Sequence, residues 1–257
     1  MEFIIIPLTA FAASLLTFFS GFGLGTILLP VFAIWFSLDI SIALTAVVHF
    51  LNNIFKLILV GKHANKAVIL KFGLPAMIAA FIGAAIIVAV THLEPLAQYE
   101  FFGHIRQVTP VKLMIALLMI FFTLFEIIPK FKNIQFDPKY LSVGGILSGF
   151  FGGLSGHQGA LRSAFLVRAG LTKEGFIATG VVIACLIDLT RLSVYASHFT
   201  QDGFSNGATI TIAATLAAFA GAYIGSKVLK KITMNTVQQF VSVGLFLLAI
   251  GIAMGLI

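Results

Sequence analysis

The chain has 257 residues, of which 60% are hydrophobic and only 10% are charged. A soluble domain carries about 25% charged residues, so this composition excludes a protein whose whole surface faces water. The formal net charge of +7 does not predict a nucleic-acid partner, because the loops of membrane proteins collect Lys and Arg that orient the chain. Several apolar runs reach the length of about 18 residues that is typical of membrane-spanning helices. We therefore predict an all-α polytopic membrane protein embedded in the lipid bilayer.

Polar residues, Gly and Pro divide the apolar sequence into ten segments. In chain order they cover about 3–19, 25–37, 40–61, 68–91, 110–129, 139–152, 157–170, 173–198, 207–231 and 235–257. The most polar connection follows the fifth segment and divides the chain almost equally. This division predicts a first transmembrane repeat over 1–129, a cytoplasmic linker over 130–138 and a second repeat over 139–257, all within one membrane domain.

Short motifs recur in the same order in the two halves. Ser20-Gly21-Phe22 recurs as Ser148-Gly149-Phe150, and AAFIGA at 79–84 recurs as AAFAGA at 217–222. Between these motifs three further pairs align: Asn53 with Asp188, Lys56 with Arg191, and His63 with His198. The shared order predicts a duplicated unit of five segments. Because five is odd, the second unit is inverted in the membrane relative to the first.

The distribution of loop cations predicts the topology. If all ten segments alternate sides, eleven Lys and Arg residues fall on one side, and only Arg106 and Lys112 fall on the other. The side with more Lys and Arg is normally cytoplasmic. We therefore expect both termini to be extracytoplasmic.

Four of the segments are too short to cross the membrane. The first, second, sixth and seventh contain roughly 13–17 residues, whereas a spanning helix needs about 20. We predict that they form two helical hairpins, which enter from opposite sides and meet near the middle of the membrane. The first tip contains Ser20, Gly21, Gly23 and Gly25. Short or interrupted helices at matching positions of inverted halves indicate a transporter's binding site.

The second tip combines glycines with polar side chains and a cation. Arg162 follows it by about one helical turn, and an Arg deep in the bilayer needs water or a partner. Helix N-termini bind anions, and the guanidinium fork suits oxyanions. The predicted substrate-binding residues here are Ser155, Gly156, His157, Gln158, Gly159, Arg162 and Ser163. The alternative is that the glycines only permit close packing and that Arg162 pairs with Asp188.

Two longer segments carry polar faces. His49, Asn52, Asn53 and Lys56 share one face of the third segment, and Asp188, Arg191 and Tyr195 share one face of the eighth. We assign Asn52, Asn53, Lys56 and Arg191 to substrate binding, and His49, Asp188 and Tyr195 to coupling or gating. Three alternatives stay open: Asp188 and Arg191 neutralise each other, Lys56 extends to the cytoplasmic surface, and the histidines are hydrogen-bonded packing residues.

One motif indicates a different class of protein. Gly153-Leu154-Ser155-Gly156 fits the G-x-S-G sequence of rhomboid intramembrane proteases, which pair the serine with a histidine on another helix. The whole-chain repeat argues against this class, and we assign no catalytic residue. The sequence contains no H-E-x-x-H motif, no phosphate-binding loop and only one cysteine, so we predict neither a metal nor another cofactor.

The two hairpin sequences resemble a known family. SGFGLGTILLP at 20–30, with the helix after it, is similar to the first repeat of the TauE/SafE sulfite exporter family, and SGFFGGLSGHQGALRSAFL at 148–166 is similar to the second. The resemblance covers essentially the whole chain. It implies a multi-pass transporter in the bacterial inner membrane that exports sulfite or related sulfonates. A passive anion channel is the alternative function, and a homodimer is left open.

Overall fold

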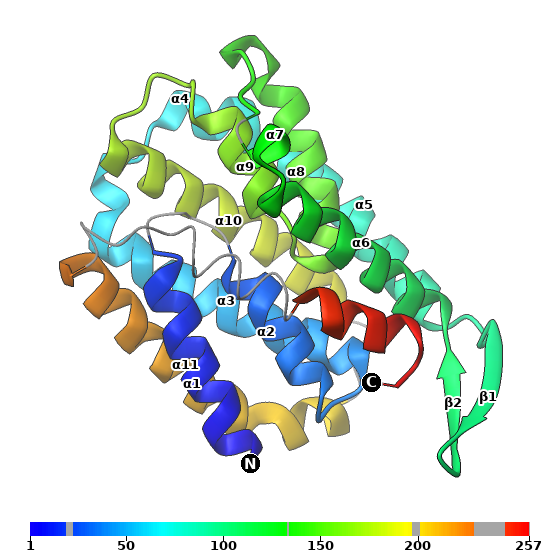
Figure 1. The fold of residues 1–257 in the computed structure, drawn as a ribbon. Coiled ribbons are helices and arrows are strands. Elements are labelled where there is room, and N and C mark those ends of the chain that lie inside the picture. The colour runs from blue at the N-terminus through cyan, green and yellow to red at the C-terminus, as the bar shows by residue number, and fades with distance from the viewer. Residues whose placement is uncertain (19–22, 133, 197–200, 229–244, 257) are drawn as a thin grey trace.

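The computed structural model describes residues 1–18, 23–132, 134–196, 201–228 and 245–256. These residues form a bundle of helices with one small β-hairpin at its side (Figure 1). The elements of the first half are α1 (Glu2–Leu16), α2 (Leu24–Ala33), α3 (Leu38–Val60), α4 (Lys66–Val68), α5 (Leu74–Thr91), β1 (Ala97–Phe101), β2 (His104–Val108) and α6 (Pro110–Ile127). Those of the second half are α7 (Pro129–Lys132), α8 (Leu141–Ser155), α9 (Gly159–Leu166), α10 (Lys173–Tyr195), α11 (Gln201–Val228) and a helical stretch over 245–253.

The long apolar segments form helices of membrane-spanning length. Among the described residues, four stretches are long and apolar enough to cross a bilayer: Leu38–His63, Lys66–Thr91, Lys173–Tyr195 and Gly207–Lys227. The helices of the two predicted hairpins are shorter, with 15 and 10 residues in α1 and α2 and 15 and 8 residues in α8 and α9. At 1.5 Å per residue, α9 is about 12 Å long, well below the ~30 Å of the hydrocarbon layer.

Helices of the two halves pair across the bundle. The most extensive contacts join α5 to α8 and α1 to α11, while α3 packs against α10 at the centre (Figure 1). The recurring AAF-x-GA motif contributes to both outer pairs. A Cβ atom on Gly83 would lie 2.2 Å from the carbonyl oxygen of Phe150, and one on Gly221 would lie 2.3 Å from that of Phe11. Only glycine permits backbones to approach so closely.

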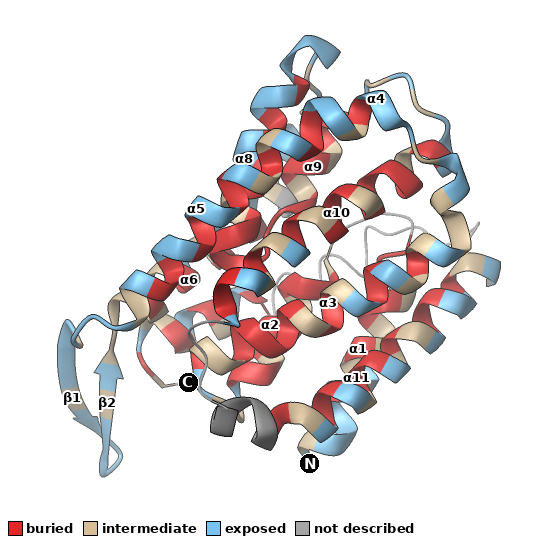
Figure 2. Ribbon diagram, turned by 180° about the vertical axis from the view of Figure 1, so that it is seen from behind, coloured by how far each residue is buried: buried red, intermediate tan, exposed pale blue. Residues whose placement is uncertain are grey.

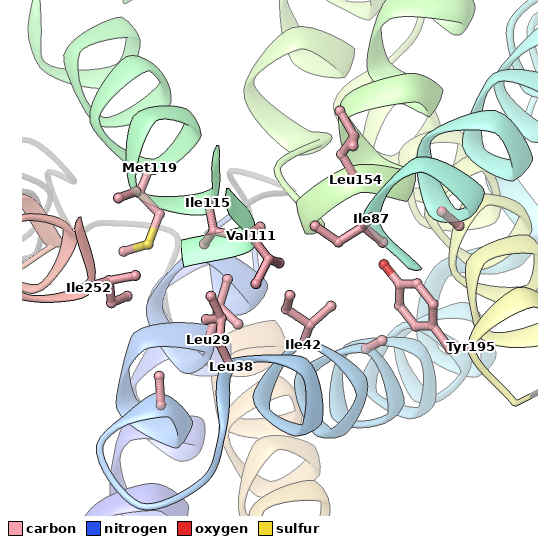
Figure 3. Packing of buried hydrophobic residues seen from close by; sticks show 14 of the residues in the cluster. Leu29, Leu38, Ile42, Ile87, Val111, Ile115, Met119, Leu154, Tyr195 and Ile252 are labelled. Atoms are coloured by element: carbon pink, nitrogen blue, oxygen red, sulfur yellow. The ribbon is translucent and has the colours of Figure 1, made fainter. Parts of the chain in front are cut away.

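Among the described residues, four apolar clusters lie between these helices. The largest connects α2, α3, α5, α6, α8, α10 and the helical stretch over 245–253, and includes Leu29, Ile42, Ile115 and Met119 (Figure 3). Buried residues occupy the inner faces of the helices, and exposed residues the outer ones (Figure 2). Many exposed side chains are themselves apolar, including Ile58 at 78% and Ile78 at 69% exposure. An apolar outer surface of this kind suits contact with lipid rather than water.

One feature of the described fold is not helical. Between α5 and α6, β1 and β2 pair in antiparallel register. They are joined by Phe102 and Gly103, both with positive φ, as a two-residue hairpin turn of type I′ requires. The Arg106 guanidinium donates a hydrogen bond of 3.1 Å to the carbonyl oxygen of Leu256. The hairpin therefore holds the C-terminal end of the bundle in place.

Some helix boundaries differ from the sequence-based segments. The predicted segment 157–170 contains only the eight residues of α9, because Gly156 and Gly170 both have positive φ and interrupt the helix on either side. The predicted segment 25–37 contains α2, which ends at Ala33. The arrangement as ten segments in two inverted repeats stays a prediction, as do the domain limits.

Candidate functional site

Both hairpin tips depend on glycines with a left-handed backbone. Gly23 has a φ of +112° directly before α2, and Gly156 has a φ of +81° directly after α8. Residues with a Cβ rarely adopt these angles, so the two glycines allow the chain to turn inside the bundle. The predicted first-tip residues Ser20 and Gly21 lie outside the described part of the chain, and so does His198.

One cavity lies where the two tips meet. It is lined by Gly23, Gly25, Thr26, His49, Phe122, Gly156, His157, Gln158, Gly159, Ala160 and Arg162. A Cβ atom on Gly25 would lie 3.9 Å from the carbonyl oxygen of Gly156 and 3.7 Å from Cδ2 of His49. The first turns of α2 and α9 thus both border the cavity. About 10 Å³ is open to the centre of a water molecule, which is room for about one water.

Asp188 is the centre of a buried polar network beside this cavity. Its Oδ1 accepts hydrogen bonds from Nε of Arg191 at 3.0 Å and from Nε2 of Gln158 at 3.2 Å. Its Oδ2 lies 2.6 Å from Nδ1 of His49 and accepts a hydrogen bond of 3.3 Å from Nδ2 of Asn53. Asp188 also forms an ion pair with Nη2 of Arg191 at 2.9 Å, and its side chain is fully buried. The structure thus brings together the polar faces of α3 and α10, whose contacting residues are 135 or more positions apart in the sequence.

Gln158 connects this network to Arg162. Its amide nitrogen donates to Asp188, and its amide oxygen accepts a hydrogen bond of 2.9 Å from Nη1 of Arg162. Its main-chain oxygen accepts a hydrogen bond of 2.9 Å from the hydroxyl of Ser148. The first two bonds engage both polar atoms of the Gln158 side chain, which in turn positions the Arg162 guanidinium at the cavity wall.

His157 lies on the other side of the second tip. Its Nδ1 is 2.9 Å from the hydroxyl of Ser155, and its ring stacks on Phe122 of α6 with 5.4 Å between the ring centroids. The residue is 3% exposed. Its Nε2 has no hydrogen-bond partner in the part of the chain that the structure describes. A buried polar atom without a partner is unfavourable, so Nε2 is an atom at which a ligand would be stabilised.

The other predicted site residues have different surroundings. Lys56 is 5% exposed, and its ammonium lies 5.7 Å from the centre of the Phe18 ring. The amide oxygen of Asn52 accepts a hydrogen bond of 3.1 Å from the hydroxyl of Ser14. The Tyr195 hydroxyl donates a hydrogen bond of 2.7 Å to the carbonyl oxygen of Gly153, which joins α10 to α8. Ser163 lies in α9 and is half-buried.

Sequence reasoning missed several residues of the site. Phe122 lines the cavity and stacks on His157, and Thr26 lines it from the first turn of α2. Ser14 and Ser148 hold Asn52 and Gln158. The two serines lie on short segments rich in small residues, a weak signal that could have been used. Phe122 offers no such signal, because phenylalanine occurs 27 times in this chain.

Positive charge exceeds negative charge inside the bundle. Among the residues whose burial the structure describes, Lys56, Arg162 and Arg191 are buried cations, whereas Asp188 is the buried acid. Asp188 and Arg191 form an ion pair. These described buried residues therefore include three cations and one acid. Burying such charge is costly unless an opposite charge is present.

Apolar helices of spanning length, together with a polar cavity between two pairs of shorter helices, are the features of an integral membrane protein. The chain belongs to the TauE/SafE sulfite exporter family, whose model matches residues 6–254. The resemblance of the hairpin sequences to this family is thereby confirmed. Comparison with curated proteins and with solved structures gives no match.

Proposed function

We propose that this chain is a secondary transporter that exports small sulfur oxyanions, sulfite or related sulfonates, across the bacterial inner membrane. The observation that carries the proposal is the cavity between the hairpin tips, which combines the buried Arg162 with the first turns of α2 and α9. Helix N-termini present free N–H groups and partial positive charge. An oxyanion at this place would bring negative charge beside the Arg162 guanidinium, which lines the cavity.

The predicted inverted topology would support alternating access to this cavity. The first hairpin would enter from outside and the second from the cytoplasm, with both termini outside and the 130–138 linker inside. The tips separate the two sides, and room for about one water is too little for sulfite. In this proposal the described conformation is the closed one. Movement of either hairpin would open the cavity to one side.

Arg162 provides the direct test of the binding site. Arg162→Ala should reduce affinity for sulfite by at least about a hundredfold, because two lost charge-assisted hydrogen bonds are worth about 1.5–3 kcal/mol each. Arg162→Lys should bind more weakly than the unmodified protein, since an ammonium lacks the planar fork. Arg168→Ala is the matched control, because Arg168 lies six residues further along and is exposed. Titration with sulfite measures the affinity of the purified unmodified protein and of each of the three variants. Unchanged binding by Arg162→Ala would place the site elsewhere.

The passive anion channel differs from a carrier in counterflow. In liposomes, an unlabelled anion on one side accelerates uptake of labelled sulfite through a carrier, because each reorientation carries a bound ion. A channel shows no such stimulation. If saturating unlabelled sulfite does not accelerate the uptake of labelled sulfite, the result favours the channel.

The surroundings of Ser155 argue against a serine protease. Its hydroxyl donates to the carbonyl oxygen of Phe151 at 3.3 Å, and its histidine neighbour lies two residues away on the same tip. In serine hydrolases, the second ring nitrogen of the base is held by a third group. Here Nε2 of His157 has no hydrogen-bond partner among the described residues, and the cavity has no room for a peptide.

A further inference from the structure

The tautomer of His157 depends on the direction of the Ser155 hydroxyl. Ser155 has one hydrogen, and its hydroxyl oxygen lies 3.3 Å from the carbonyl oxygen of Phe151 and 2.9 Å from Nδ1 of His157. In one of the two arrangements, the hydroxyl donates to Phe151 and the N–H group at Nδ1 donates to the hydroxyl. In a neutral ring, this leaves Nε2 as an acceptor with a free lone pair. Nε2 is also the ring atom without a partner among the described residues.

The charged groups around His157 favour a neutral ring in the absence of an anion. Arg162 of α9 lines the same cavity, and Nη1 of Arg191 lies 2.6 Å from where a Cβ of Gly156 would be. Asp188 of α10 is engaged by Arg191 and His49, and His49 of α3 also lines the cavity. The residues that α2 and α6 contribute to its lining carry no charge. Two guanidinium groups oppose a third positive charge on the ring.

An oxyanion in the cavity reverses this balance. Its negative charge favours the imidazolium form, and its oxygen would meet the lone pair of Nε2. Two acceptors cannot bind each other unless one proton lies between them. That proton either arrives on the anion or is taken up by the ring.

We propose that His157 and the bound oxyanion share one proton at Nε2. Building on the proposed function, this assigns to the site a preference for singly protonated oxyanions. Such an ion, for example bisulfite, binds the neutral ring through its own O–H group. An oxyanion without a hydroxyl, for example a sulfonate, binds together with one proton from solution, which forms the N–H bond at Nε2 and leaves an imidazolium beside the anion.

Methanesulfonate is a suitable probe, because its oxygens accept hydrogen bonds and it does not titrate where histidine does. As the pH rises, its dissociation constant should increase by up to about tenfold per pH unit, between the pH at which the free ring loses its proton and the higher pH at which the anion-bound ring does. Calorimetry in buffers of different ionisation enthalpy should show uptake of about one proton per bound anion, as the same linkage requires. In His157→Gln, both the pH dependence and the proton uptake should disappear, because the amide cannot titrate.

The matched control is His104→Gln in the exposed strand β2, which should retain the pH dependence of the unmodified protein. Absence of proton uptake in the unmodified protein overturns the proposal, even if His157→Gln does not fold. Proton uptake that persists in folded His157→Gln also overturns it, and points to His49. If neither methanesulfonate nor sulfite binds at any pH, the proposed function fails as well. Binding without proton uptake leaves that function standing.

Discussion

Asp188→Asn should strongly destabilise the protein. The substitution keeps the size of the side chain but removes the charge that four neighbouring side chains engage. The Arg191 guanidinium, 1% exposed, would lose its ion-pair partner. Removing one member of a buried ion pair costs about 3–5 kcal/mol, because the remaining charge stays buried without compensation.

The expected effect can be measured as a melting temperature. For a chain of this size, 1 kcal/mol corresponds to about 2–4 °C, so the apparent melting temperature should fall by roughly 6–20 °C. The double variant Asp188→Asn/Arg191→Gln should recover part of this loss, since both charges are then absent. Asp137→Asn is the matched control: Asp137 is exposed and accepts a hydrogen bond of 2.9 Å from the main chain of Lys139, which asparagine also accepts.

The assay is a thermal melt of the detergent-purified variants, followed by sulfite titration of those that remain folded. The reasoning would be refuted if Asp188→Asn melted within about 2 °C of the unmodified protein, less than the effect of 1 kcal/mol. Should such a variant also lose transport, Asp188 would act in coupling rather than in neutralising Arg191.

Three further predictions concern packing, chemistry and topology. Gly149→Ala should lower the melting temperature, since its Cβ would lie 2.1 Å from the Ala76 carbonyl oxygen and overpacking costs about 1–3 kcal/mol. Gly180→Ala is the control and should leave the melting temperature unchanged, because the atom nearest to its Cβ would be 3.5 Å away. Ser155→Ala should bind sulfite only modestly more weakly, and a fluorophosphonate probe should not label Ser155; labelling would support the protease. A reporter fused to the C-terminus should be active outside the cytoplasm; cytoplasmic activity would contradict the inverted scheme.

The broad features of the fold could be predicted from the sequence because they depend on local patterns. Length and apolarity alone determine which segments suit a bilayer, and the four long stretches coincide closely with predicted segments. The shared face of His49, Asn53 and Lys56 follows from helical spacing, and all three are buried. The turn at Phe102 and Gly103 was not predicted, because phenylalanine rarely adopts a positive φ.

The candidate site could be predicted only in part. The glycines and Arg162 of the second tip stand out in an apolar chain, and they line the cavity. Their partners do not stand out. Gln158 lines the cavity, and its contacts with Arg162 and Asp188 could not be read from the sequence; its role in substrate binding stays a prediction. The contact of the Tyr195 hydroxyl with the α8 backbone could not be read from the sequence either, and the role of Tyr195 in gating stays a prediction.

The sequence by itself determined that this is a helical membrane protein with two short hairpins, because hydrophobicity, segment length and helical spacing are properties of neighbouring residues. Only the tertiary structure decided which polar atoms are satisfied. His49 meets Asp188 across 139 residues, and Phe122 of α6 supports the ring of His157 in the second half. Such contacts depend on how helices cross and how closely glycines let them approach. That Nε2 of His157 has no hydrogen-bond partner among the described residues is therefore a property of the packed molecule, because it is defined by what surrounds the ring in space.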